Sequence, residues 1–211
     1  MNADHSYTRP VADPVDSATE RIGILSGTFD PVHVGHIVVA VDTRVALGLD
    51  RVLLVIAGDP WQKRGRVVAT AEQRLMLAAA AVEDLDGVEV SAVEVERSGA
   101  SVTADTLEVF AGPHRDLFLI LGADAVANMG TWRRLDETRG LATIVVVERT
   151  GDAHATPPGP GWRVERVTIP RVDVSSTDIR ERLAGGRPID GLVPPAVVHA
   201  IAAHGLYTRP R

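Results

Sequence analysis

Four short and almost continuous runs of apolar residues constrain the fold of this chain more than any other feature. They lie at residues 22–25, 52–56, 117–121 and 143–147. Each run has the length of a β-strand, and a strand that is apolar at successive positions is buried on both of its faces. Both faces of a sheet are covered when helices connect parallel strands. The runs therefore predict a parallel sheet between two layers of helices.

Segments with helical spacing separate these strands. The first, 36–47, is followed by Gly48, which suits the end of a helix. Thr70 and Gln73 have the spacing of a capping box and predict the start of a helix that extends to about residue 85. Further helices are predicted at 103–110, 176–183 and 195–204, one or two strands at 88–95, and a last strand at 164–169. The predicted class is α/β, with a Rossmann-like, doubly wound and mainly parallel sheet and a small C-terminal helical region.

The length of 211 residues suits one domain, which we place at residues 21–211. Residues 1–20 include several acidic residues and lack the apolar centre of a secretory signal, so we expect a flexible N-terminal tail there. A cloning remnant or a misassigned start is the alternative origin of this tail. The segment 149–161 is rich in proline and glycine and is predicted to be a mobile surface loop.

The charge balance excludes some classes of partner. The chain has 22 basic and 28 acidic residues, which give a formal net charge of −6. Duplex nucleic acids and anionic membranes both require a concentrated basic face, so neither is an expected partner. No segment has the length of a membrane span, and the absence of cysteine excludes a disulfide framework and a thiolate metal site. We expect a cytoplasmic protein with small-molecule ligands, and the oligomeric state is left open, a homodimer included.

A Gly-Thr step and two histidines follow the first predicted strand. The sequence from Ser26 to His36 lacks both the Gly-Lys-Ser/Thr ending of a P-loop and the G-x-G-x-x-G spacing of a dinucleotide fingerprint. Gly27 nevertheless lets a ligand approach the backbone, and the helix that begins near Gly35 directs its free amides toward the strand ends. His33 and His36 are three residues apart, so they can converge on one side of that helix start and donate hydrogen bonds to a triphosphate.

Two further roles are possible for the histidines. The side chains could cap the helix or pack locally, or they could bind zinc. Asp30 is the nearest further ligand of the usual type, and a spacing of three does not match the i, i+4 pair of a metal-binding helix. The favoured prediction is a phosphate site, with no metal ion bound directly by the protein.

A second pattern suited to anions occurs near the C-terminus. Ser175, Ser176 and Thr177 supply hydroxyls and amides at a predicted helix start, and Arg180 follows one turn later. A helix N-terminus combined with an arginine is a frequent phosphate cradle. Taken alone, however, the segment is better explained as an ordinary N-cap.

Together the two patterns resemble the motifs of the nucleotidyltransferases with the H-x-G-H signature. The matching residues are Gly27-Thr28-Phe29-Asp30-Pro31 with His33-Val34-Gly35-His36, and later Ser175-Ser176-Thr177-Asp178-Ile179-Arg180. Within that superfamily the chain most resembles the bacterial nicotinate mononucleotide adenylyltransferases, from Arg21 to Thr208. The resemblance implies transfer of the adenylyl group of ATP to nicotinate mononucleotide by in-line attack, without a covalent intermediate. It also implies Mg²⁺ held mainly by the phosphates.

The resemblance assigns roles to individual residues. The catalytic residues would be His33, His36 and Arg180. The ATP-binding residues would be Gly27, Thr28, Phe29, Gly35, Gly122, Asp124, Ser175, Ser176 and Thr177. The acceptor-binding residues would be Lys63, Thr103, Trp132 and Arg149. Trp132 would stack on the pyridine ring, with a buried core position as the alternative, and Lys63 would approach the acceptor unless it is a solvated loop charge.

Four departures from the family pattern concern mainly the acceptor. Ser26 replaces a glycine and Thr150 replaces a proline, and both changes are expected to be tolerated. Val102 stands where the family has a tyrosine, and Arg133 and Arg134 stand where aromatic or polar residues are frequent. Two alternatives are therefore kept. One is the same chemistry on nicotinamide mononucleotide or another phosphorylated acceptor, and the other is a non-catalytic nucleotide-binding paralogue.

Overall fold

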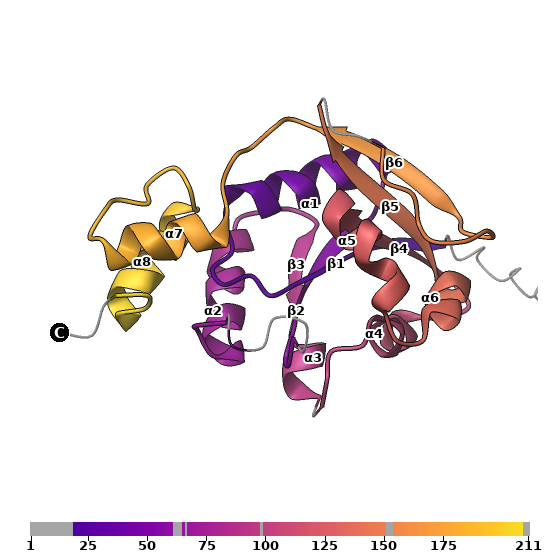
Figure 1. Cartoon of the computed structure of the whole chain (residues 1–211), viewed down its shortest axis with the longest axis horizontal. Helices are drawn as coiled ribbons and strands as arrows, with labels where there is room; N and C mark the ends of the chain where they lie inside the picture. The colour runs from indigo at the N-terminus through magenta and orange to yellow at the C-terminus, as the bar shows by residue number, and fades with distance from the viewer. Residues whose placement is uncertain (1–18, 61–64, 66, 98, 151–153, 209–211) are drawn as a thin grey trace, which may run out of the picture.

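A sheet of six parallel strands forms the centre of the molecule (Figure 1). The structure is a computed structural model that describes residues 19–60, 65, 67–97, 99–150 and 154–208. The strand order is β3-β2-β1-β4-β5-β6. The strands are β1 (Glu20–Gly27), β2 (Arg51–Ile56), β3 (Val88–Ser91), β4 (Arg115–Gly122), β5 (Ala142–Arg149) and β6 (Val164–Ile169). The α/β, Rossmann-like class is confirmed, and every pairing between these strands is parallel.

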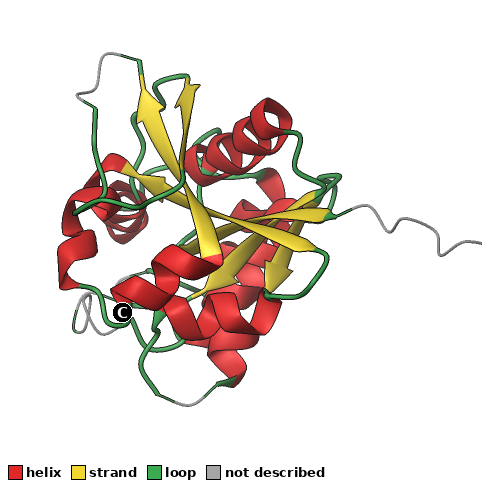
Figure 2. Cartoon of the chain, turned by 90° about the vertical axis from the view of Figure 1, so that its right-hand side faces the viewer, coloured by secondary structure: helices red, strands yellow, loops and turns green. Residues whose placement is uncertain are grey.

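Helices cover both faces of this sheet (Figure 2). They are α1 (Val34–Leu47), α2 (Ala71–Val82), α3 (Val93–Glu96), α4 (Thr103–Phe110), α5 (Ala123–Asn128), the 3-10 helix η2 (Met129–Thr131), α6 (Leu135–Leu141), α7 (Ser176–Ala184) and α8 (Pro195–His204). The last two form the small C-terminal helical region that the sequence predicts. Within the described residues, no helix combines the length and the apolar character needed to cross a membrane.

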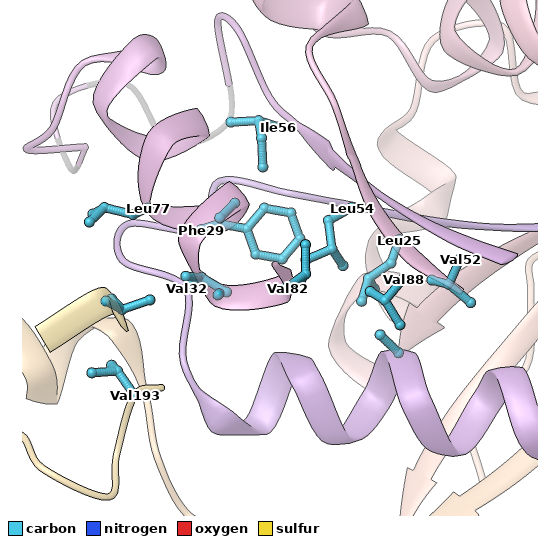
Figure 3. Packing of buried hydrophobic residues seen from close by; sticks show 14 of the residues in the cluster. Leu25, Phe29, Val32, Val52, Leu54, Ile56, Leu77, Val82, Val88 and Val193 are labelled. Carbon is cyan, nitrogen blue, oxygen red and sulfur yellow. The ribbon is translucent and has the colours of Figure 1, made fainter. Parts of the chain in front are cut away.

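Alternate residues of each central strand enter two separate hydrophobic cores. In β2, Val52, Leu54 and Ile56 join the core that contains side chains of α1, α2 and α8 (Figure 3). Leu53 and Val55 of the same strand join the opposite core, with side chains of α4 and α5. Full burial of one such aliphatic side chain contributes about 1.5–3 kcal/mol. Burial on both faces is the reason that these strands are continuous apolar runs.

The strand order reverses between β1 and β4, which are neighbours at the centre of the sheet. The chain moves outward from β1 through β2 to β3 on one side, and from β4 through β5 to β6 on the other. In open parallel sheets, ligands bind in the crevice beyond the carboxyl ends of the strands at such a reversal. Gly27 ends β1 and Gly122 ends β4, so both lie at this crevice.

The predicted helix ends agree with the structure at most positions. Gly48 follows α1 in the left-handed conformation, with a φ of 57°, which favours glycine. At the start of α2, the Gln73 amide donates to Thr70 Oγ1 over 3.3 Å and the Thr70 amide donates to Gln73 Oε1 over 2.9 Å. This reciprocal cap contributes about 1 kcal/mol. Gly185 and Gly205 follow α7 and α8 as predicted.

Four features differ from the sequence-based prediction. The alternating stretch at 88–95 gives one strand, β3, and then the helix α3, because Glu94 turns inward to accept a hydrogen bond from Thr106 Oγ1 at 2.5 Å. Helix α2 ends at Val82 rather than near residue 85. Helices α5 and α6 occupy a region for which no element was predicted. Strand β1 begins at Glu20, one residue before the expected domain boundary.

Candidate active site

The loop between β1 and α1 is packed so tightly that a side chain at either of two glycines would displace its neighbours. A Cβ atom on Gly27 would lie 2.9 Å from the Phe29 ring. A Cβ atom on Gly35 would lie 3.1 Å from His33 Nδ1 and 3.3 Å from a methyl group of Val174. Phe29 itself is buried and has a φ of 50°, which costs a non-glycine residue about 1–2 kcal/mol. The loop is thus held in one conformation by its core contacts.

The two histidines of this loop lie against each other at the start of α1. Their ring centroids are 3.6 Å apart and the rings are nearly parallel, with an interplanar angle of 24°. The backbone N–H of His33 donates to His36 Nδ1 over 3.2 Å. Since Nδ1 of His36 is the acceptor, Nε2 carries the proton of the neutral ring and can donate to a ligand. The convergence that the sequence predicts is present, and His36 also contributes to capping the helix.

His33 is nearly buried, with 8% of its surface exposed. Burial lowers the pKa of His33 to about 4, and the positive charge of Arg149 acts in the same direction. The imidazole is therefore neutral at physiological pH and can act as a hydrogen-bond donor rather than as a cation. Its Nδ1 atom is buried without a hydrogen-bond partner among the described residues.

The start of α7 contacts the same loop from the C-terminal part of the chain. Ser176 Oγ donates to the backbone carbonyl of Pro31 over 2.8 Å. Arg180 Nη1 donates to the carbonyl of Asp30 over 2.7 Å, and Nη2 donates to Thr177 Oγ1 over 3.3 Å. Ser175 is the N-cap of α7, and its Oγ accepts from the Asp178 amide over 3.1 Å. The ordinary N-cap and the contact with the histidine loop are therefore both present.

Asp30 is a central residue of this site, although sequence reasoning assigned it no role beyond its place in the family motif and a possible part in zinc binding. Its carboxylate is buried and accepts hydrogen bonds from the amides of Val68 and Ala69 and from the Tyr207 hydroxyl. These bonds leave the carboxylate engaged with the protein. Among the described residues, no cluster of three or more His, Cys, Asp or Glu side chains could hold a metal ion.

Arg74 is a second residue whose role was not predicted from the sequence. Its side chain is 1% exposed and donates to the carbonyls of Thr28 at 2.7 Å and Ala57 at 2.8 Å. Burial lowers the pKa of Arg74, while the charge of Asp30 acts in the opposite direction. The guanidinium thus joins the ends of β1 and β2. The available signal was an arginine followed by the apolar residues 75–77, a position where a charged side chain needs buried partners.

A cavity of about 440 Å³ lies on the other side of the end of β1. Thr28 forms part of its wall and connects it to the histidine loop. Of the predicted nucleotide-binding residues, the cavity brings together Gly27, Thr28, Thr103, Asp124 and Trp132, along with the departures Val102 and Arg133. Glu94, Ser101 and Asn128 also line it and were not predicted. Trp132 is half-buried and packs partly on the core, so it combines the cavity position and the core position that the sequence allowed.

Besides the residues of the histidine loop and of α7, Gly122 and Arg149 are predicted residues that do not line this cavity. Gly122 is at the end of β4 as the N-cap of α5, with open space around the position of a Cβ atom. Arg149 ends β5 and is exposed. Its positive charge helps to lower the pKa of His33, and it does not line the cavity. Lys63 lies outside the described residues.

Comparison with known proteins gives a consistent picture. Residues 24–182 match the family described as cytidylyltransferase-like. A protein named "Probable nicotinate-nucleotide adenylyltransferase" from Roseiflexus sp. (strain RS-1) is 47% identical over 193 residues, which cover 88% of this chain and 97% of that protein. One of the same name from Corynebacterium kroppenstedtii is 46% identical over 191 residues, which cover 89% of this chain and 90% of the relative.

A similar fold occurs among solved structures. The nicotinic acid mononucleotide adenylyltransferase of Plasmodium falciparum, solved in complex with NaAD, superposes with a TM-score of 0.72. The superposition covers 89% of this chain and 97% of that one, at 17% sequence identity. At this identity the likeness concerns the fold.

Proposed function

The chain belongs to the nicotinate-nucleotide adenylyltransferases of the cytidylyltransferase-like family, and from this premise we infer how its residues carry out the reaction. The enzyme transfers the adenylyl group of ATP to nicotinate mononucleotide, and the products are deamido-NAD and pyrophosphate. The observation that carries our assignment of roles is the stacked pair of His33 and His36 beside Arg180, with the large cavity on the other side of Thr28.

We place the triphosphate of ATP at the start of α1. There His33 and His36 are neutral donors, and the free amides of the helix N-terminus attract the phosphates. Arg180 contacts the same loop and supplies the positive charge that pyrophosphate needs as it leaves. The remaining ATP contacts are assigned to the ends of β1 and β4 and to the start of α7, through Gly27, Thr28, Phe29, Gly35, Gly122, Asp124, Ser175, Ser176 and Thr177.

The acceptor is assigned to the cavity, where Trp132 would stack on the pyridine ring beside Thr103. Arg133 lines the same cavity, and its positive charge favours the carboxylate of nicotinate over the neutral carboxamide of nicotinamide. Arg149 acts on His33 from the end of β5, so we assign it to the phosphate of the acceptor rather than to the ring. Lys63 is retained as a further acceptor residue on the grounds of family resemblance.

The reaction that this arrangement supports is a direct displacement. An oxygen of the acceptor phosphate forms a bond with the α-phosphorus of ATP as the bond to the pyrophosphate oxygen breaks, in line and without a covalent enzyme intermediate. Catalysis then consists of alignment and of neutralising the charge that develops on pyrophosphate. We propose that Mg²⁺ enters as part of the ATP complex with phosphate oxygens as ligands, because Mg²⁺ prefers such ligands and the described carboxylates form no cluster. We place the enzyme in the cytoplasm, in keeping with a chain that has no cysteine.

One experiment tests the activity and the identity of the acceptor together. Purified protein is incubated with ATP, Mg²⁺ and either nicotinate or nicotinamide mononucleotide, and the release of pyrophosphate is measured against a control without acceptor. We expect release that depends on the nicotinate form. Release with nicotinamide mononucleotide alone would overturn the assignment of nicotinate mononucleotide as the acceptor. This alternative is specific because Val102 lines the cavity where the family has a tyrosine. No release with any acceptor would favour the non-catalytic paralogue.

A further inference from the structure

The hydroxyl of Tyr207, near the C-terminus, reaches the loop that carries the catalytic histidines. It donates to Asp30 Oδ1 over 2.9 Å, and the two residues are 177 positions apart in the sequence. Tyr207 follows α8 and is buried, with 9% of its surface exposed. The end of the chain is therefore attached to the loop between β1 and α1 through one buried hydrogen bond.

This bond completes the set of donors around the Asp30 carboxylate. Oδ1 accepts from Tyr207 and from the Ala69 amide at 3.1 Å, and Oδ2 accepts from the Val68 amide at 2.8 Å. Arg180 lies close by, but its nearest approach to the carboxylate is 3.8 Å, from Nη1 to Oδ2. The hydrogen bond of that nitrogen goes instead to the backbone carbonyl of Asp30, at 2.7 Å. The guanidinium thus hydrogen-bonds the backbone of Asp30, and its ion pair with the carboxylate is long.

The backbone on both sides of this bond is strained. Among the described residues, only three non-glycine residues have a positive φ, and two of them are Phe29 at 50° and Tyr207 at 61°. Phe29 directly precedes Asp30. Such conformations persist only where the surrounding contacts impose them, and they are frequent at ligand sites. Burial and the negative charge of Asp30 also raise the pKa of Tyr207 far above its ordinary value, so the hydroxyl stays protonated and remains a donor.

We propose that Tyr207 is a positioning residue for ATP binding, which keeps the Asp30 carboxylate occupied so that Arg180 remains available to the triphosphate. Without the tyrosine hydroxyl, Oδ1 loses one of its two donors. A buried carboxylate oxygen then seeks another donor, and the Arg180 guanidinium is the nearest cation to that carboxylate among the described ion pairs. A guanidinium drawn into that pair is lost to the phosphates. This inference rests on the assignment of Arg180 to the triphosphate of ATP.

The test is the substitution Tyr207→Phe, which removes the hydroxyl and keeps the packing of the ring. We expect the KM for ATP to rise about fivefold, with the KM for nicotinate mononucleotide unchanged within about twofold. The affinity for a non-reacting ATP analogue with an α,β-methylene bridge, measured by calorimetry, is expected to fall by the same factor. Because the analogue undergoes no turnover, this second measurement stands even if the protein had no activity with any acceptor.

Two control variants separate positioning from a loss of stability. Ile201→Val deletes one buried methylene in α8 and lowers stability without touching Asp30. Thr208→Ala removes a neighbouring hydroxyl that donates only to the carbonyl of Gly205 among the described hydrogen bonds. Both controls are expected to bind the analogue as the wild type does. An unchanged analogue affinity in Tyr207→Phe, or an equal loss in Ile201→Val, would overturn the proposal.

Discussion

His33 and His36 form a stacked pair in which the backbone amide of the first residue donates to Nδ1 of the second, over 3.2 Å. The bond fixes the orientation of the His36 ring and leaves its Nε2 as the protonated nitrogen. Neither residue could provide this arrangement alone, because the amide belongs to one and the acceptor to the other. In the proposed function this pair would offer oriented donors to phosphate oxygens before any ligand arrives, which is the condition for electrostatic stabilisation of a leaving group.

Replacement of His36 by alanine is expected to lower kcat by at least about a hundredfold, because one oriented donor to the triphosphate is lost. The fold should survive, since the buried Phe29 ring and the hydrogen bonds of the Asp30 carboxylate still hold the loop. Steady-state pyrophosphate release and a thermal melt measure the two effects. His114→Ala, at an exposed position before β4, serves as the matched control and should retain full activity. Near-normal turnover in His36→Ala would contradict the catalytic role.

His33 should make the stability of the protein depend on pH. Its pKa is lowered from 6.5 to about 4 by burial and by Arg149, so the unfolded chain binds a proton at this residue throughout that interval and the folded chain does not. The stability linked to the neutral His33 ring is fully present above about pH 6.5. As the pH falls toward 4, the free energy of unfolding decreases by on the order of 2–3 kcal/mol. Urea unfolding at pH 7 and pH 4.5 measures it. His33→Asn should show a smaller loss between these two values, and an identical loss would refute the assignment.

Arg133 is expected to contribute to the choice of acceptor. Its charge at the cavity favours a nicotinate carboxylate, so Arg133→Gln should reduce the ratio of kcat/KM for nicotinate against nicotinamide mononucleotide by about tenfold. The KM for ATP should not change. Arg187→Gln, an exposed arginine outside this cavity, is the control. If the ratio stays constant in Arg133→Gln, another group must recognise the carboxylate.

Arg134 links two helices next to Arg133, which lines the cavity assigned above to the acceptor. Its guanidinium pairs with Asp105 and Glu108 of α4 and with Glu137 of α6, although its φ is 56°. We expect Arg134→Gly and Arg134→Ala to raise the KM of the acceptor by a similar factor of about twofold to fivefold, and salt should weaken the effect of each substitution.

The two variants should nevertheless differ in stability. Glycine tolerates the left-handed conformation and alanine does not, so the glycine variant is expected to be more stable by about 1 kcal/mol. Thermal melts of the pair measure the strain at this position. Equal melting temperatures would indicate that the backbone relaxes once the arginine is gone.

Arg74→Met is expected to destabilise the protein by about 3 kcal/mol, because the carbonyls of Thr28 and Ala57 lose buried donors. Denaturant unfolding gives the value. Arg163→Met removes an exposed arginine whose side chain makes only long bonds among the described hydrogen bonds, so its cost should stay within about 0.5 kcal/mol. Similar costs for the two substitutions would show that the buried bonds of Arg74 are not a major source of stability.

Local signals in the sequence were sufficient for most of the fold. A strand buried on both faces has to be apolar at successive positions, so runs such as 52–56 were recognisable without tertiary information. The Thr70–Gln73 cap and the glycine after α1 act through neighbouring backbone groups, and they too could be predicted. The same holds for His33 and His36, because a spacing of three at a helix start determines that they meet.

Tertiary contacts decided the remainder. Glu94 lies in a stretch whose polar and apolar residues alternate as in a strand. The stretch forms the helix α3 instead, in which the buried Glu94 carboxylate accepts a hydrogen bond from Thr106. Asp30 and Tyr207 are 177 residues apart, and Arg74 donates to the distant carbonyls of Thr28 and Ala57, so only the assembled fold brings these groups within reach. The sequence by itself thus determined which residues are candidates for binding phosphate, since each motif consists of neighbouring residues. The tertiary structure decided how they are held, because buried charges and hydroxyls must be satisfied by groups that lie far away in the chain.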